Sequence, residues 1–61
     1  MSLDELKTQN IRTVTEKALV CFIQNGITNT KVSEIAKTAG LTERSVYRYF
    51  PTKSDIVISA A

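Results

Sequence analysis

Residues 31–50, KVSEIAKTAGLTERSVYRYF, determine the fold that the sequence predicts. They contain two short segments with apolar residues at helical spacing, separated by Ala39-Gly40-Leu41. Because glycine adopts positive φ angles without a Cβ clash, Gly40 permits a sharp change of direction. Two helices joined by a turn of about three residues that contains glycine form a helix-turn-helix. The stretch therefore predicts this motif over about residues 31–50.

The first of these segments predicts a short amphipathic helix. Its apolar residues follow the i, i+3, i+4, i+7 spacing of one helix face, and they are Val32, Ile35, Ala36 and Ala39. Thr30 precedes them, and its hydroxyl is expected to cap the helix by accepting a bond from a free backbone N–H.

The second segment predicts another short helix, with Thr42 as its N-cap. Val46 and Phe50 are four residues apart, so both are expected on its inner side. Tyr49 fits either the core or its edge. Pro51 prevents simple continuation of the helix.

A longer helix is expected before the motif. Ile11, Val14, Ala18 and Phe22 form one apolar face at spacings of three and four. Gly26 is expected to end this helix in the left-handed conformation.

The start of a fourth helix is expected over residues 53–61. Thr52-Lys53-Ser54-Asp55 resembles a capping box, in which the Asp reaches back to the Thr backbone. No Gly, Pro or basic residue follows to end this helix. We therefore expect one all-α domain over residues 1–61, truncated before a further body. Val20 and Ile23 lie off the main apolar face and are expected to be exposed where that body would pack.

Composition excludes several functional classes. The chain has no histidine and a single cysteine, Cys21, so neither a disulfide within the chain nor a tetrahedral zinc site is expected. The sequence contains neither a Gly-rich phosphate loop nor a Cys/His pair that would suggest an enzyme. The longest apolar run, residues 18–23, is far shorter than the roughly 20 residues that cross a bilayer. A reduced thiol and no targeting segment favour the cytoplasm.

The positive charge is concentrated in the motif. Residues 1–29 carry three basic and three acidic residues and sum to zero, whereas residues 30–53 carry five basic and two acidic residues and sum to +3. A local excess of this kind suits contact with phosphates. A solvated basic face without a partner has the same signature.

The outer face of the second short helix is the part that packing does not explain. It presents Glu43, Arg44, Ser45, Tyr47 and Arg48. A helix fits the major groove of B-DNA, where Arg can offer two donors to a guanine. Arg44 is placed for that contact, and Tyr47 and Arg48 suit phosphates. Glu43 can accept from a cytosine amino group, or pair with one of the arginines and orient it.

Residues 18–56 resemble the N-terminal domain of the TetR family of regulators. The resemblance is carried by Phe22, Gly26, Thr30, Ile35-Ala36, Ala39-Gly40-Leu41-Thr42, Val46-Tyr47-Arg48-Tyr49-Phe50, Pro51-Thr52-Lys53 and Asp55-Ile56. Tyr49 stands where the family often has histidine. Arg44 and Glu43 also depart from the common residues, which leaves the cognate base sequence open.

The resemblance implies roles by position. Thr30 and the start of its helix would lie on a phosphate, Ser33 would reach the groove, and residues 42–45 would contact bases or the phosphates beside them. Tyr47 and Lys53 would contact further phosphates. The complete set of expected DNA-binding residues is Thr30, Lys31, Ser33, Lys37, Thr42, Glu43, Arg44, Ser45, Tyr47, Arg48 and Lys53.

The resemblance also implies partners outside this chain. A larger helical body would follow, bind a small-molecule effector and form a homodimer on a near-palindromic operator in double-stranded DNA. The chain itself would hold no cofactor, and the regulator would most often be a repressor. The alternative is a helical module that binds protein through the same fold without binding DNA.

Overall fold

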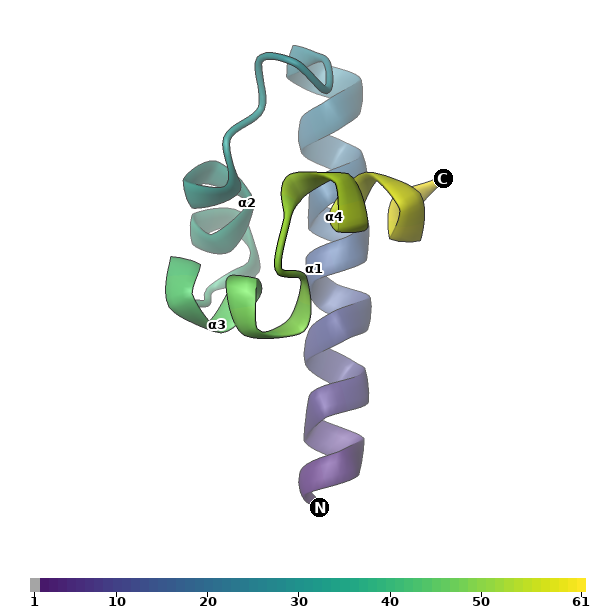
Figure 1. Ribbon diagram of the computed structural model, residues 1–61, viewed down its shortest axis with the longest axis vertical. Helices are drawn as coiled ribbons and strands as arrows, with labels where there is room; N and C mark the ends of the chain where they lie inside the picture. Colours follow the sequence, from purple (N-terminus) through teal and green to yellow (C-terminus); the bar gives the residue numbers. More distant parts are fainter. Residues whose placement is uncertain (1) are drawn as a thin grey trace.

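The computed structural model describes residues 2–61, and Met1 of the predicted domain lies outside them. Residues 2–61 form four helices, in the order α1 (Leu3–Asn25), α2 (Val32–Ala39), α3 (Glu43–Tyr49) and α4 (Lys53–Ala60) (Figure 1). Residues 2–61 include no strand. The predicted all-α fold, with a helix-turn-helix followed by a fourth helix, is confirmed.

The first helix sets the length of the molecule. A capping box begins α1, because the Glu5 N–H donates to the Ser2 hydroxyl and the Ser2 N–H donates to the Glu5 carboxylate. At about 1.5 Å per residue, its 23 residues account for the longest dimension of the domain, 34 Å. Its first turns extend beyond the other three helices (Figure 1).

The core lies along the predicted apolar face of α1. Val14, Ala18 and Phe22 are buried there, and Ile11 packs partly against them. Helices α2 and α4 pack on α1, and α3 packs on α2. In Figure 1, α2 and α3 lie together on one side of α1, while α4 crosses its C-terminal half. The long helix is therefore the support on which the motif is assembled.

The end of α1 differs from the prediction in its backbone geometry. Gly26 has a positive φ of 84°, but its ψ of 153° is extended and not left-handed helical. Its N–H still donates to the carbonyl oxygen of Phe22 at 2.8 Å. The extended ψ directs the chain away from the helix into residues 27–31, which lead to α2.

The prediction that Thr30 caps α2 is wrong. The N-cap is Lys31, which makes no side-chain capping bond. The Thr30 side chain is only 1% exposed, and its hydroxyl donates to the carbonyl oxygens of Gly26 at 2.8 Å and of Cys21 at 3.2 Å. Buried polar groups need partners. The Thr30 hydroxyl finds them in carbonyl oxygens at the end of α1, so it does not cap the start of α2.

The turn of the motif is as the sequence predicts. Gly40 has φ 74° and ψ 25°, the left-handed conformation. The N–H of Leu41 donates to the carbonyl of Ala36 at 2.9 Å, which is the bonding pattern of a glycine-terminated helix end. Ala39 still belongs to α2, so only Gly40 and Leu41 separate that helix from Thr42, the N-cap of α3.

Helix α4 begins with the predicted capping box. The Asp55 N–H donates to the Thr52 hydroxyl, and the Thr52 N–H donates to the Asp55 carboxylate at 3.1 Å. Ile56 is fully buried against the core. The hydroxyls of Thr15 and Ser59, which lie 2.9 Å apart, join α4 to α1 on the surface.

Part of the apolar surface has no cover within residues 2–61. Val20 and Ile23 are exposed, as predicted, with Ile23 at 76%. Beside them is an apolar depression where α1, the segment after it and α4 meet, lined by Leu19, Phe22, Ile27, Val57, Ala60 and Ala61. Over the same described residues, no helix is both long and apolar enough to span a bilayer.

Candidate DNA-binding surface

Helix α3 is held on one face and free on the other. Val46 is fully buried, and Phe50, which ends the helix, is buried beside it as predicted. With 3.6 residues per turn, Arg44 and Arg48 lie opposite Val46, and Glu43 and Tyr47 lie beside them; all four are exposed. We call these four residues the outer face of α3. Tyr47 is 42% exposed, so its ring is not part of the core.

Ser45 lies at the edge of this outer face and is half-buried. Its N–H donates to the Thr42 hydroxyl at 3.1 Å, which caps α3. The Thr42 hydroxyl in turn donates to the Ser45 hydroxyl at 2.9 Å. The two side chains therefore form a polar pair that fixes the first turn of α3. The Ser45 hydroxyl keeps its own hydrogen available as a donor.

The far end of α3 is fixed by a contact that the sequence did not predict. The side-chain amide of Asn10 donates to the Tyr49 hydroxyl at 3.0 Å, joining α1 to α3. Tyr49 is half-buried, which places it at the edge of the core. These two residues are 39 positions apart, so no local spacing signal indicates their contact.

The expected residues of α2 are all exposed. Lys31 precedes the helix, Ser33 lies in its first turn and Lys37 lies in its last turn. A cation near the carboxyl end of a helix also interacts favourably with the helix dipole, so Lys37 has a structural role available besides a phosphate contact. Ile35 and Ala36 are buried on the other side of α2, which keeps these three polar side chains at the surface.

The expected phosphate contact by the Thr30 hydroxyl is contradicted. A side chain that is 1% exposed and bonded to two carbonyl oxygens cannot also reach a phosphate at the surface. From the sequence, a threonine before α2 fits two roles, because threonine serves equally well as a surface cap and as a buried donor.

Lys53 is half-buried as the first residue of α4.

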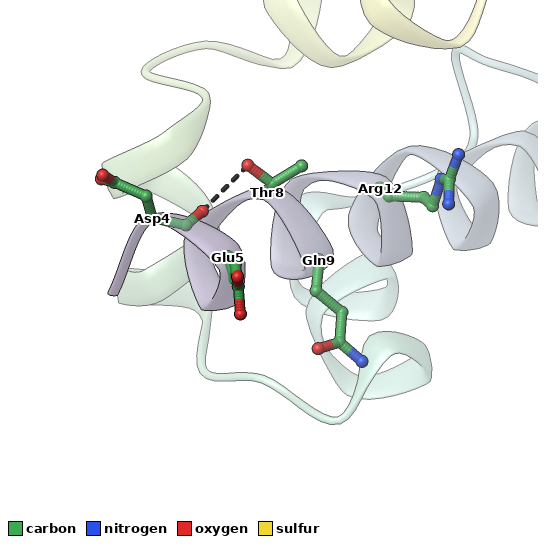
Figure 2. A pocket seen from close by; sticks show the side chains of 5 residues that line it. All are labelled: Asp4, Glu5, Thr8, Gln9 and Arg12. Atoms are coloured by element: carbon green, nitrogen blue, oxygen red, sulfur yellow. Dashed lines mark hydrogen bonds between the residues drawn. The ribbon is translucent and has the colours of Figure 1, made fainter. Parts of the chain in front are cut away.

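A separate depression lies on the side of α1 that bears the first acidic residues (Figure 2). All five of its lining residues, Asp4, Glu5, Thr8, Gln9 and Arg12, belong to this one helix. Thr8 donates back to the Asp4 carbonyl at 2.9 Å. The depression is open and shares no residue with the outer face of α3, so it forms no part of the candidate DNA-binding surface.

The fold and this surface define a helix-turn-helix domain. The chain belongs to the tetR family of bacterial regulatory proteins, because the model of that family matches residues 14–60. The match covers all of α2, α3 and α4 and the half of α1 that carries the core.

Similar proteins include regulators from two bacteria. The HTH-type transcriptional regulator AcrR of Shigella flexneri is 42% identical over 70% of this chain and 20% of its own length. The fatty acid metabolism regulator protein of Bacillus subtilis (strain 168) is 39% identical over 75% of this chain and 24% of its own length. The chain thus spans about a quarter or less of these relatives. No solved structure matches it.

Proposed function

We propose that this chain binds double-stranded DNA by placing α3 in the major groove. The observation that carries the proposal is the division of α3 into a buried side and an outer face. Val46 is completely buried, whereas Arg44 and Arg48 are exposed one turn apart on the same side. A helix positioned in this way can enter a major groove about 12 Å wide without loss of its packing.

Within the groove, the side chains of the outer face have different tasks. Arg44, in the first turn of α3, offers a planar pair of donors to the O6 and N7 atoms of a guanine. Glu43 precedes it and can accept from a cytosine amino group. Tyr47 and Arg48 lie one turn further along, where a hydroxyl and a guanidinium would donate to phosphates.

Exposed and half-buried polar residues around α3 would hold the domain on the two DNA strands. Thr42 and Ser45 flank the start of α3, and Lys53 begins α4 next to it. Lys31, Ser33 and Lys37 would contact the backbone from α2. The net charge of +3 over residues 30–53 supports this arrangement, since phosphate contacts supply most of the affinity of such interfaces.

The whole regulator would add a sensing and dimerising body. The relatives are four to six times longer than the matched region, because that region is 24% of one and 16% of another, the uncharacterised regulator YuxN of Bacillus subtilis (strain 168). The exposed Ile23 and the apolar depression between α1 and α4 suit packing by such a body. A small-molecule effector would bind to that further body, outside this chain.

Dimerisation would determine the form of the operator. Two copies of α3 related by a two-fold axis would lie about one turn of DNA apart, roughly 34–36 Å, on a near-palindromic sequence. Effector binding would change their separation and release the DNA, so that the regulator acts as a repressor in the cytoplasm.

Binding of a labelled duplex across a salt series tests the proposal. Several phosphate contacts predict that log K falls with log salt at a slope of about −0.9 per contact. A slope equivalent to one counterion or fewer would contradict the phosphate roles. If DNA did not bind at all and a protein partner protected α3 from hydrogen exchange, the domain would instead be a protein-binding module.

A further inference from the structure

A second depression lies between the first turns of α1 and the last turn of α3. It is lined by Leu3, Leu6, Lys7, Arg48 and Tyr49. Two cationic side chains, one from each helix, face this depression, and no acidic residue lines it. Two like charges at one site repel each other, and an anion bound between them would offset that repulsion.

The acidic residues of the same turns line a different depression on α1. Asp4 and Glu5 line the depression shown in Figure 2, together with Arg12. At 100° per residue, Lys7 shares a side of α1 with Leu3 and Asn10, and Asn10 contacts α3. Asp4 lies about 60° from Lys7 on the side away from Asn10, and Glu5 lies about 160° from it. Lys7 therefore lines the depression beside α3, and neither carboxylate does.

The walls of this depression are held in place. The Asn10 amide donates to the Tyr49 hydroxyl at 3.0 Å, so the α1 segment that bears Lys7 and the α3 turn that bears Arg48 are tied together. Both cations are exposed. An anion that enters the depression would meet them without a rearrangement of the backbone.

We propose that Lys7 is a DNA phosphate contact that acts together with Arg48, so that the DNA-binding surface extends onto the first turns of α1. The inference rests on the proposed function, because Arg48 belongs to the outer face of α3 that would lie in the groove. A backbone phosphate beside that groove would lie between the two cations. The exposed apolar side chains of Leu3 and Leu6 provide a surface for the adjoining deoxyribose.

Composition hides this contact. Residues 1–29 have no net charge, and this neutral sum gives no sign that Lys7 lines a depression that contains neither Asp4 nor Glu5. Only the position of α3 beside α1 gives Lys7 a cationic neighbour.

The test compares Lys7→Gln with Lys17→Gln in salt-dependent binding to a labelled duplex. Lys17 lies on the same helix, is also exposed, and does not line the depression. We expect Lys7→Gln to reduce the magnitude of the salt slope by about 0.9 and to weaken binding roughly fivefold to tenfold near 0.1 M salt, on every DNA sequence alike. Lys17→Gln should change neither quantity.

The double variant Lys7→Gln/Arg48→Gln identifies a shared phosphate. If both cations hold one phosphate, the losses in affinity should not add, because contacts with a common partner are coupled. Equal behaviour of Lys7→Gln and Lys17→Gln, with salt-dependent binding otherwise intact, would overturn the Lys7 contact alone. Binding of the unmodified chain without salt dependence would overturn the proposed function itself. Circular dichroism checks that each variant remains folded.

Discussion

The side-chain amide of Asn10 donates a hydrogen bond to the hydroxyl of Tyr49 at 3.0 Å, and this bond ties the end of α3 to α1. The main packing of α3 is on α2. The orientation of α3 relative to the long helix therefore depends on few contacts, of which this bond is one. Its two partners are half-buried.

Tyr49→Phe removes only this hydroxyl and should lower the free energy of unfolding by about 0.5–1.5 kcal/mol. Asn10→Ala should have a similar effect, and the double variant should cost less than the sum of the two. Urea denaturation of the four chains measures the coupling. Strictly additive losses would show that the bond contributes nothing in solution.

Thr30→Val should be markedly destabilising, by about 1–3 kcal/mol, although it preserves the shape of the side chain. The change removes the buried hydroxyl that donates to the carbonyl oxygens of Cys21 and Gly26. Thr8→Val is the control, because the Thr8 hydroxyl bonds only to the exposed Asp4 carbonyl within α1. A Thr30→Val chain of normal stability but weakened DNA binding would restore the phosphate role.

The two glycines should respond differently to asparagine. Gly40 is left-handed helical and has open space around its Cα, so Gly40→Ala should cost about 1 kcal/mol of conformational strain and Gly40→Asn less. Gly26 combines φ 84° with ψ 153°, a region that only glycine occupies readily. There both alanine and asparagine should cost about 1–3 kcal/mol. An asparagine that rescues both positions equally would contradict this distinction in thermal or urea denaturation.

Arg44→Ala should lose about 1–3 kcal/mol of binding on the preferred DNA site and should relax the base preference there. Lys53→Ala should weaken binding to all sequences alike, because a phosphate carries no base information. Selection from a random duplex pool, followed by titration of preferred and scrambled sites, separates the two effects. If Arg44→Ala also weakened every sequence equally, Arg44 would be a backbone contact.

A single copy of the 61 residues should bind DNA weakly, since it lacks the avidity of a linked pair. Joining two copies through a dimeric coiled coil and a short linker should tighten binding to a near-palindrome by about 10²–10⁴-fold. Insertion of five base pairs between the half-sites places them on opposite faces of the duplex and should abolish most of that gain. Insensitivity to the insertion would contradict a two-fold arrangement of the recognition helices.

Several elements were predictable from sequence because they depend on neighbours in the chain. The caps Thr42 and Thr52 act on backbone groups three residues away, and Gly40 supplies a left-handed turn that other residues adopt with difficulty. The buried faces of α1 and α2 follow from apolar spacings of three and four. Local bonding and helical periodicity thus determined where the helices lie and which sides they bury.

The tertiary structure alone decided the remaining features of the surface. Thr30 became a buried donor because the end of α1 presents two carbonyl oxygens to it, and a threonine before a helix has no local feature that distinguishes this role from capping. The position of Asn10 beside Tyr49, and of Lys7 beside Arg48, arises from helix packing that joins residues about 40 positions apart. The sequence by itself determined a helix-turn-helix and the exposed face of its second helix. Only the packing of the helices decided which side chains outside the motif, such as Asn10 and Lys7, lie next to that helix.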